Sequence, residues 1–154
     1  MAEKPCVLIV EARFYEDIAD ELAKGTIAEL EKAGVAYERI SVPGTFEIPA
    51  AIRFAMRSME THASSTDYAG YIALGCVIRG ETDHYDHICR ESSRSLMDLS
   101  VEHGAALGFG VLTCENREQA WARAAVDQKN KGADAAAACL RMMELQRQFR
   151  LVMR

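Results

Sequence analysis

The residues best suited to chemistry lie in one short segment, 75–87, which contains two glycines, a threonine, three acids and two histidines. Gly75, Gly80 and Thr82 have the spacing of a nucleotide-binding P-loop, but Glu81 stands where that motif has lysine. A carboxylate there repels a triphosphate, so the segment does not predict an NTPase. Residues 80–82 instead precede a predicted helix, whose free N–H groups and dipole favour a single phosphate. The same residues also suit a tight turn capped by the threonine or by the aspartate that follows it.

The two histidines, His84 and His87, follow this anion cradle directly. With Asp83 and Asp86 they could form a metal cluster, but no third ligand of clear spacing accompanies them. We favour one working imidazole, because a histidine in the first turn of a helix beside an anion site exchanges protons near neutral pH. His84 is nearer the cradle. The alternative for each histidine is a surface residue that solvates the helix start.

An aromatic residue, Phe14, follows the first apolar run at a place where a dinucleotide-binding fold has a glycine-rich turn. The sequence lacks that turn, which disfavours dinucleotide binding. An aromatic side chain at the end of a strand can stack on a planar heterocycle. It can equally pack against the helix that follows, so both interpretations stand.

Five further residues are ambiguous from pattern alone. Phe109 lies inside an apolar run and is predicted to be core. Arg123 and Lys131 lie on late helical segments, where most cations are only solvated. Cys76 and Cys114 lie near strand ends without the neighbouring histidine and acid that activate a nucleophile, so we expect them to line a pocket.

The elements that must position these residues follow from hydrophobic periodicity. Four apolar runs alternate with segments of helical period, which is the pattern of βαβ units around a parallel sheet. With right-handed crossovers we predict an α/β, flavodoxin-like three-layer αβα sandwich, whose four-stranded parallel sheet has the order 2-1-3-4. Ligands are then expected at the carboxyl ends of the strands. The predicted strands are Cys6–Val10, Ala36–Val42, Gly70–Val77 and Ala106–Leu112.

Helical segments separate these strands. The first is expected to stop at Gly34 and to bury one face, formed by Ile18, Leu22, Leu30 and Ala33. Asn116, three residues before Gln119, predicts a capping box at the start of a later helix. The other helices are expected near residues 47–59, 85–102 and 132–149.

Length and composition exclude several classes of protein. The 154 residues predict a single domain, 1–154. A net charge of -5 argues against general nucleic-acid binding. The apolar runs are too short to cross a membrane or to form a signal-peptide core. Five cysteines without a C-x-x-C pair indicate neither a disulfide framework nor a zinc site, so we expect a cytoplasmic protein without a metal.

Five collinear segments resemble the signature motifs of the lumazine synthase family, and together they span nearly the whole chain. Five motifs in the family's order and spacing are far more specific than any one of them. The segments are Ala12–Phe14, Pro43–Pro49, Leu74–His84, Phe109–Asn116 and Asn130–Gly132.

The resemblance implies a role for each candidate residue. His84 would donate and accept protons, and Phe14 would stack on a pyrimidine ring, while Phe109 would close the site from an adjacent subunit. The remaining contacts to the ribityl chain and to the polar edge of the ring would come from Thr45, Phe46, Glu47, Cys76, Val77 and Ile78. A keto-phosphate would be held by Glu81, Thr82, Arg123 and Lys131.

The implied reaction joins two small molecules, 5-amino-6-(D-ribitylamino)uracil and 3,4-dihydroxy-2-butanone 4-phosphate. It proceeds through an imine, expels phosphate and closes a second ring to give 6,7-dimethyl-8-ribityllumazine. No cofactor is implied, because proton transfer by His84 and charge stabilisation by Arg123 and a helix N-terminus suit each step.

Four departures from the family's usual pattern stand out. Tyr15 replaces a usual Asn, Thr45 a usual Ala, and Cys76 a usual Thr or Ser. The fourth lies at residues 125–129, which lack the glycine of a common hinge and predict a continuous helix. With a short amino-terminal arm, this predicts a homopentamer, or a dimer of pentamers, in place of a sixty-subunit shell. Active sites would lie between adjacent subunits.

Two other functions remain as alternatives. A non-catalytic or weakly active paralogue that binds lumazine or flavin would tolerate the loss of His84 or Arg123, and both are present. An archaeal-type riboflavin synthase would use two lumazines and no keto-phosphate, which leaves the anion cradle and Arg123 without a purpose. A flavodoxin-like signalling module is a more distant third alternative, because it would require acidic residues at the end of the first strand and a phospho-acceptor aspartate at the end of the third.

Overall fold

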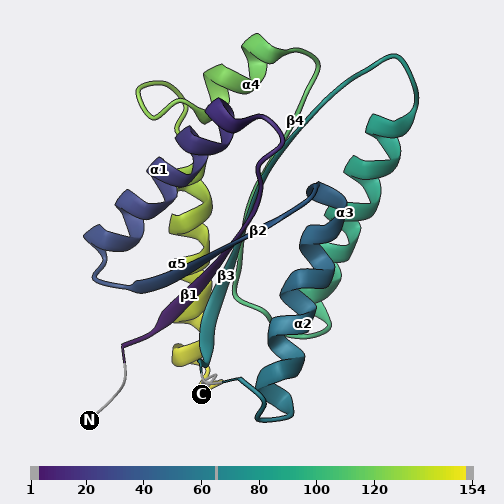
Figure 1. Cartoon of the computed structure of the whole chain (residues 1–154). Coiled ribbons are helices and arrows are strands. Elements are labelled where there is room, and N and C mark those ends of the chain that lie inside the picture. Colours follow the sequence, from purple (N-terminus) through teal and green to yellow (C-terminus); the bar gives the residue numbers. More distant parts are fainter. Residues whose placement is uncertain (1–3, 65, 152–154) are drawn as a thin grey trace.

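The protein folds around one parallel sheet, as predicted. The computed structural model describes residues 4–64 and 66–151. Within them, four parallel strands lie in the order β2-β1-β3-β4 (Figure 1). The strands are β1 (Cys6–Ala12), β2 (Ala36–Val42), β3 (Tyr68–Ile78) and β4 (Leu107–Cys114). Most of β3 is buried, which agrees with its continuous apolar run.

Helices cover both faces of the sheet, as Figure 1 shows. One face carries α1 (Glu16–Lys32), α4 (Arg117–Ala124) and α5 (Lys131–Gln148). The other carries α2 (Ile48–Glu60), which follows the short 3-10 helix η1 (Thr45–Glu47), and α3 (His84–Val101). Side chains alternate along β1, so Val7 and Ile9 enter one core while Leu8 and Val10 enter the other. In the part of the chain that the structure describes, no helix has both the length and the apolarity to cross a membrane.

Strand β1 is longer than predicted, because a charged residue within it is paired. The sequence prediction ended the strand at Val10, before Glu11. Glu11 is nevertheless buried in β1 and forms ion pairs with Arg13 and Arg39. A carboxylate with charged partners can remain within a buried strand, whereas an unpaired one would end it.

Two of three sequence predictions about the helices are confirmed, the stop at Gly34 and the cap at Asn116, and the burial of Ala33 is not. Gly34 follows α1 with a φ of 70°, a conformation that glycine adopts readily. The side chain of Asn116 accepts a hydrogen bond of 2.9 Å from the backbone N–H of Gln119, which confirms the cap. The Gln119 side-chain oxygen in turn accepts a hydrogen bond of 2.8 Å from the backbone N–H of Glu115, one residue before the capping position. Ala33 was predicted to lie on the buried face and is exposed, because the helix has already ended there.

The prediction of a continuous helix through residues 125–129 is wrong. Helix α4 ends at Ala124 and α5 begins at Lys131. The turn between them is held by a hydrogen bond of 3.0 Å from the Val126 N–H to the Glu21 carboxylate on α1. It ends at Asn130, whose φ of 50° is left-handed. The missing glycine therefore does not make this segment helical.

Helices α1 and α5 meet through backbone contacts. A Cβ atom at Gly132 would lie 2.1 Å from the carbonyl oxygen of Leu22, and one at Gly25 would lie 2.2 Å from the Asn130 side-chain oxygen. The buried hydroxyl of Thr26 donates a hydrogen bond of 2.9 Å to the carbonyl oxygen of Gly132. Only glycine permits this approach, which fixes the first turn of α5.

Replacing Gly132 by alanine tests this contact. The added Cβ must displace backbone, so we expect Gly132→Ala to lower the free energy of unfolding by about 2–3 kcal/mol. The melting temperature should fall by roughly 4–12 °C in a chain of this size. Gly80→Ala is the control, because a Cβ at Gly80 meets nothing within 4 Å. Equal melting temperatures for the two variants would contradict the proposed contact.

Candidate active site

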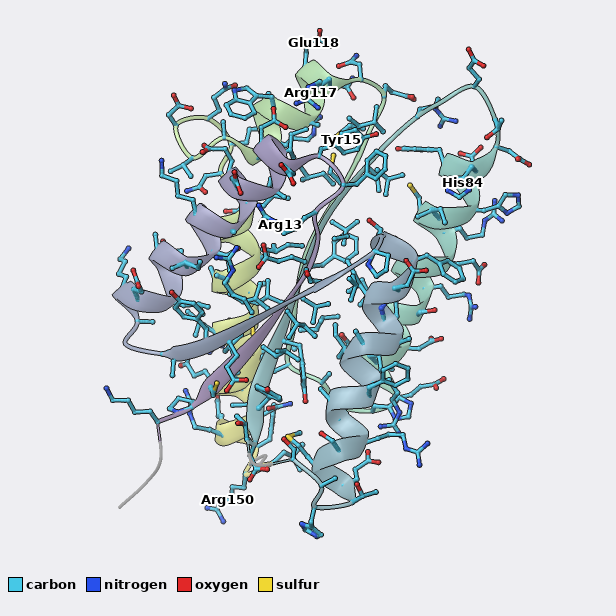
Figure 2. The ribbon with its side chains drawn as sticks, in the orientation of Figure 1. Arg13, Tyr15, His84, Arg117, Glu118 and Arg150 are labelled. Atoms are coloured by element: carbon cyan, nitrogen blue, oxygen red, sulfur yellow. The ribbon has the colours of Figure 1, made fainter. Side chains whose placement is uncertain are left out.

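A cavity of about 600 Å³ opens at the carboxyl ends of the central strands. Its walls come from the end of β1 and the turn after it, from the segment after β2, from the last residues of β3 and from the first helical turns of α3. Figure 2 shows Tyr15 and His84 at this end of the molecule, the first from the β1–α1 turn and the second from α3. The structure brings eight predicted site residues together around this cavity: Phe14, Thr45, Phe46, Glu47, Cys76, Val77, Ile78 and His84.

Two aromatic rings of the cavity are largely exposed. Phe14 is 76% exposed and Phe46 58% exposed. Phe14 and Tyr15 form a T-shaped pair, with 4.9 Å between ring centroids and 80° between ring planes, and the exposure of Phe14 shows that this contact covers little of its surface. Of the two interpretations of Phe14, packing against the following helix does not fit this exposure. An exposed aromatic ring beside a cavity suits the stacking of a flat ring.

Other parts of the cavity wall are tightly packed. Thr45 is buried, and its hydroxyl would lie 2.9 Å from a Cβ atom at Gly75, so glycine is needed there. Burial raises the pKa of the neighbouring Cys76 thiol to about 12. The thiol therefore stays protonated at neutral pH, which agrees with a lining role and not with a nucleophile.

The histidines of α3 differ in position. His84 lines the cavity, whereas His87 pairs with Asp83 at 3.2 Å between Nε2 and Oδ2. The Thr82 hydroxyl accepts a hydrogen bond of 3.2 Å from the His84 backbone N–H at the start of α3, whereas the N-cap residue, Asp83, makes no side-chain capping bond. Among the described residues, no group of three or more His, Cys, Asp or Glu side chains is arranged to hold a metal ion.

The turn that carries Glu81 and Thr82 is anchored by Arg79. Its Nε lies 2.6 Å from the Glu115 carboxylate beyond β4, and its Nη1 lies 3.4 Å from Asp86. Its guanidinium also stacks on Tyr85, with 4.3 Å from Cζ to the ring centroid. The predicted anion cradle is thus tied to both α3 and the end of β4. Sequence analysis did not assign Arg79 this role, because its partners lie on other elements.

The remaining predicted residues lie elsewhere in the chain. Phe109, Arg123 and Lys131 line a second cavity of about 510 Å³ along β4, one of the two edge strands of the sheet. Phe109 is 48% exposed, so the prediction from pattern that it is core is wrong. Lys131 pairs with Asp134, one turn further along α5, at 3.3 Å between Nζ and Oδ2. Arg123 is half-buried and donates a hydrogen bond of 3.1 Å to the Gln119 carbonyl.

Sequence analysis assigned no role to several residues that line these cavities. Asp134 could have been found from its i,i+3 spacing to Lys131 on a predicted helix. Ala12, Gly44, Gly110 and Thr113 lie within the segments that resemble the family's motifs, but none was assigned a contact of its own. The first cavity also includes Ala12, Tyr15, Gly44 and Ile88, and the second also includes Leu107, Gly110, Thr113, Ala135 and Ala138.

Each cavity is suited to half of a two-substrate reaction. The first offers exposed aromatic rings, a carboxylate and an imidazole that can transfer protons. The second offers two cations and an exposed aromatic ring. Within one chain these groups form two separate sites.

Comparison with known proteins agrees with the resemblance of the motifs. A family model described as 6,7-dimethyl-8-ribityllumazine synthase matches residues 4–147. A protein with that name from Bartonella tribocorum is 54% identical, over 97% of this chain and 95% of its own. Those from Agrobacterium fabrum and Paramagnetospirillum magneticum are 52% and 50% identical, over 95% and 94% of this chain and 97% of each relative. The chain therefore belongs to the 6,7-dimethyl-8-ribityllumazine synthase family.

Proposed function

We propose that this chain is a transferase of riboflavin biosynthesis, which condenses 5-amino-6-(D-ribitylamino)uracil with 3,4-dihydroxy-2-butanone 4-phosphate. The products are 6,7-dimethyl-8-ribityllumazine, inorganic phosphate and water. The observation that carries the proposal is that eight residues expected to bind or protonate the substrates line one cavity. The family of the chain points to the same reaction.

The first substrate is proposed to bind in the first cavity. Its pyrimidine ring stacks on the exposed ring of Phe14, and its ribityl chain lies along Thr45, Phe46 and Glu47. Backbone groups of Cys76–Ile78 meet the polar edge of the ring. This arrangement would present the 5-amino group toward His84, and holding it there removes much of the entropic cost of a two-substrate reaction.

His84 is proposed to move the protons. The 5-amino nitrogen attacks the ketone of the second substrate, and water leaves as the imine forms. Phosphate is then eliminated, and the ribityl-bearing nitrogen closes the second ring with loss of another water. Each of these steps needs a proton given or taken, which is the role that an imidazole beside the reacting atoms performs near neutral pH.

The phosphate is proposed to lie between Glu81 and Thr82 of one subunit and Arg123 and Lys131 of the next. Backbone N–H groups of the turn before α3 would bind its oxygens, and the cations would stabilise its charge as it leaves. The separation of the two cavities supports a site shared between copies of the chain. Phe109, exposed on the edge strand β4, would cover the bound pyrimidine of the neighbour.

A homopentamer, alone or as a dimer of pentamers, is the proposed assembly, because the resemblance to the family implies a ring of subunits, in which each first cavity would meet a second one. The break between α4 and α5 removes one of the two reasons that the sequence offered against a larger shell. The proposed location is the cytoplasm, where the five cysteines, all free, would remain reduced. The chemistry as proposed uses side chains and backbone groups alone. A chelator should therefore leave activity unchanged.

Two substitutions test the assigned roles. We expect His84→Ala to lower kcat by about 100-fold or more, because a general acid and base is lost. Arg123→Ala should raise KM for the keto-phosphate about tenfold and leave KM for the pyrimidine nearly unchanged. Lumazine absorbance and released phosphate measure both. The controls are His103→Ala and Arg141→Ala, which alter exposed side chains outside both cavities. Wild-type protein that binds lumazine or riboflavin without accelerating its formation would indicate a binding paralogue.

Mixing variants tests the shared site. In assemblies formed from equal amounts of His84→Ala and Arg123→Ala chains, about one quarter of the interfaces pair two intact halves. Assayed at a keto-phosphate concentration well below KM, where sites that lack Arg123 contribute little, the mixture should therefore recover to about one quarter of the wild-type activity. Mixed Phe14→Ala and His84→Ala chains are the control and should show no more than the average activity of the two variants alone, because both changes lie in the same half.

Light scattering on the same samples gives the assembly. We expect about 85 kDa, five times the 17.0 kDa of one chain, or twice that mass for a dimer of pentamers. A fully active monomer would contradict the shared site. A main species near one megadalton, as expected for about sixty subunits, would contradict the proposed assembly.

A further inference from the structure

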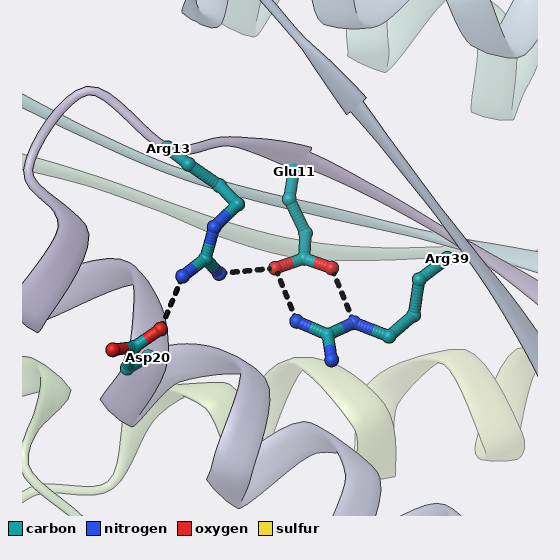
Figure 3. Close-up of polar contacts among 4 residues, drawn as sticks. All are labelled: Glu11, Arg13, Asp20 and Arg39. Atoms are coloured by element: carbon teal, nitrogen blue, oxygen red, sulfur yellow. Dashed lines mark hydrogen bonds and ion pairs between the residues drawn. The ribbon is translucent and has the colours of Figure 1, made fainter.

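A buried carboxylate lies at the carboxyl end of β1, directly before the turn that carries Phe14. Glu11 is 3% exposed. Its Oε2 accepts a bond of 2.7 Å from Arg39 Nε, and its Oε1 accepts bonds of 3.0 Å from Arg39 Nη2 and 2.8 Å from Arg13 Nη1 (Figure 3). Both oxygens are thus engaged by charged donors, which offsets the cost of burying the charge.

This network joins three elements around the β1–α1 turn. Arg39 comes from the edge strand β2, and Arg13 comes from the turn itself. Arg13 also pairs with Asp20 on α1, as Figure 3 shows. Glu11 before the turn and Asp20 after it are therefore linked through one guanidinium. The backbone between them has little freedom to move.

Phe14 follows Arg13 directly and depends on this backbone. Its ring is 76% exposed, so burial contributes little to its position. Its aromatic partner is Tyr15. Tyr15 is itself covered by Arg117, whose guanidinium Cζ lies 5.8 Å from the ring centroid and which pairs with Asp17. An exposed ring held by the backbone moves whenever the backbone moves.

We propose that Glu11 is a positioning residue for the flat heterocyclic substrate and acts through Arg13 to hold the Phe14 ring beside the cavity. The inference rests on the proposed function, because it takes Phe14 as the stacking partner of the pyrimidine. Glu11 touches neither substrate. Its contribution is to keep the stacking face in place before the substrate arrives, which spares the cost of ordering the turn on binding.

The test uses the whole assembled protein and both substrates. Glu11→Gln keeps the shape of the side chain but removes its charge. It also replaces one acceptor oxygen by an amide NH2 group, which cannot accept a hydrogen bond from the arginines. We expect KM for the pyrimidine to rise about five- to tenfold, the scale of one lost stacking contact. KM for the keto-phosphate should stay within about twofold, because Arg123 and Lys131 lie in the other cavity.

Double substitution separates positioning from general stability. If Glu11 acts through Phe14, Glu11→Gln should cause no further rise in KM once Phe14→Ala is present. Ile72→Val, in the fully buried core of the same sheet, is the matched control, which should lower stability without changing either KM. A second variant, Arg13→Ala, leaves the bonds between Arg39 and Glu11 intact and should reproduce the effect of Glu11→Gln even if that variant folds poorly.

The outcomes distinguish the two proposals. If KM rises equally for both substrates, or if Glu11→Gln still raises KM in the Phe14→Ala background, the network serves stability alone and the inference is overturned. If Phe14→Ala impairs pyrimidine binding while Glu11→Gln and Arg13→Ala do not, the inference fails and the proposed function stands. If the wild-type protein makes no lumazine, the proposed function fails and the inference fails with it.

Discussion

Much of the molecule depends on the packing of α5 against α1 and β4. Its first turn meets the backbone of α1 at Gly132, and about one turn later the carbonyl oxygen of Ala135 lies 2.0 Å from where Gly108 of β4 would carry a Cβ. No side chain fits at either point, so backbone contacts fix the position of α5 against both α1 and β4. Because protein interiors are densely packed, a shift of either neighbour would also move α5. Because α5 begins at Lys131 and the turn before it follows Arg123, the same contacts locate both cations beside β4.

Features formed by local pattern could be predicted from the sequence, and features formed by remote partners could not. The apolar runs, the stop at Gly34 and the cap at Asn116 each depend on residues a few positions apart. The extension of β1 through Glu11 depends on Arg39, 28 positions away. The break before α5 depends in part on Glu21, which is 105 positions from its partner in the turn. Periodicity contains no information about such pairs, so it ended a strand too early and continued a helix too far.

The candidate site shows the same division. Pattern alone left Phe14 undecided and assigned Phe109 to the core, because an apolar run has the same composition in an edge strand as in a central one. Phe109 is exposed because β4 is an edge strand with no neighbour on one side. The resemblance of motifs supplied what the pattern lacked, since it compares positions and not periods. It could not indicate Glu11 or Arg79, because neither was assigned a contact with a substrate.

Electrostatics gives a reason for dividing the proposed site between two copies of the chain. The first cavity holds Glu47, and Glu81 lies in the turn beside it, so a phosphate placed there within one chain would face carboxylates. The guanidinium of that turn, Arg79, is already paired with Glu115 and Asp86. The cations lie in the second cavity, around β4 and α5. In the proposed pentamer, the neighbouring subunit brings Arg123 and Lys131 opposite His84, and the phosphate then bridges two chains. A ligand that binds across an interface must favour the assembled state by as much as assembly favours its binding. Substrate binding and subunit contact are on this account one linked equilibrium, in which the first cavity alone accepts the uncharged pyrimidine and only the assembled ring accepts both substrates.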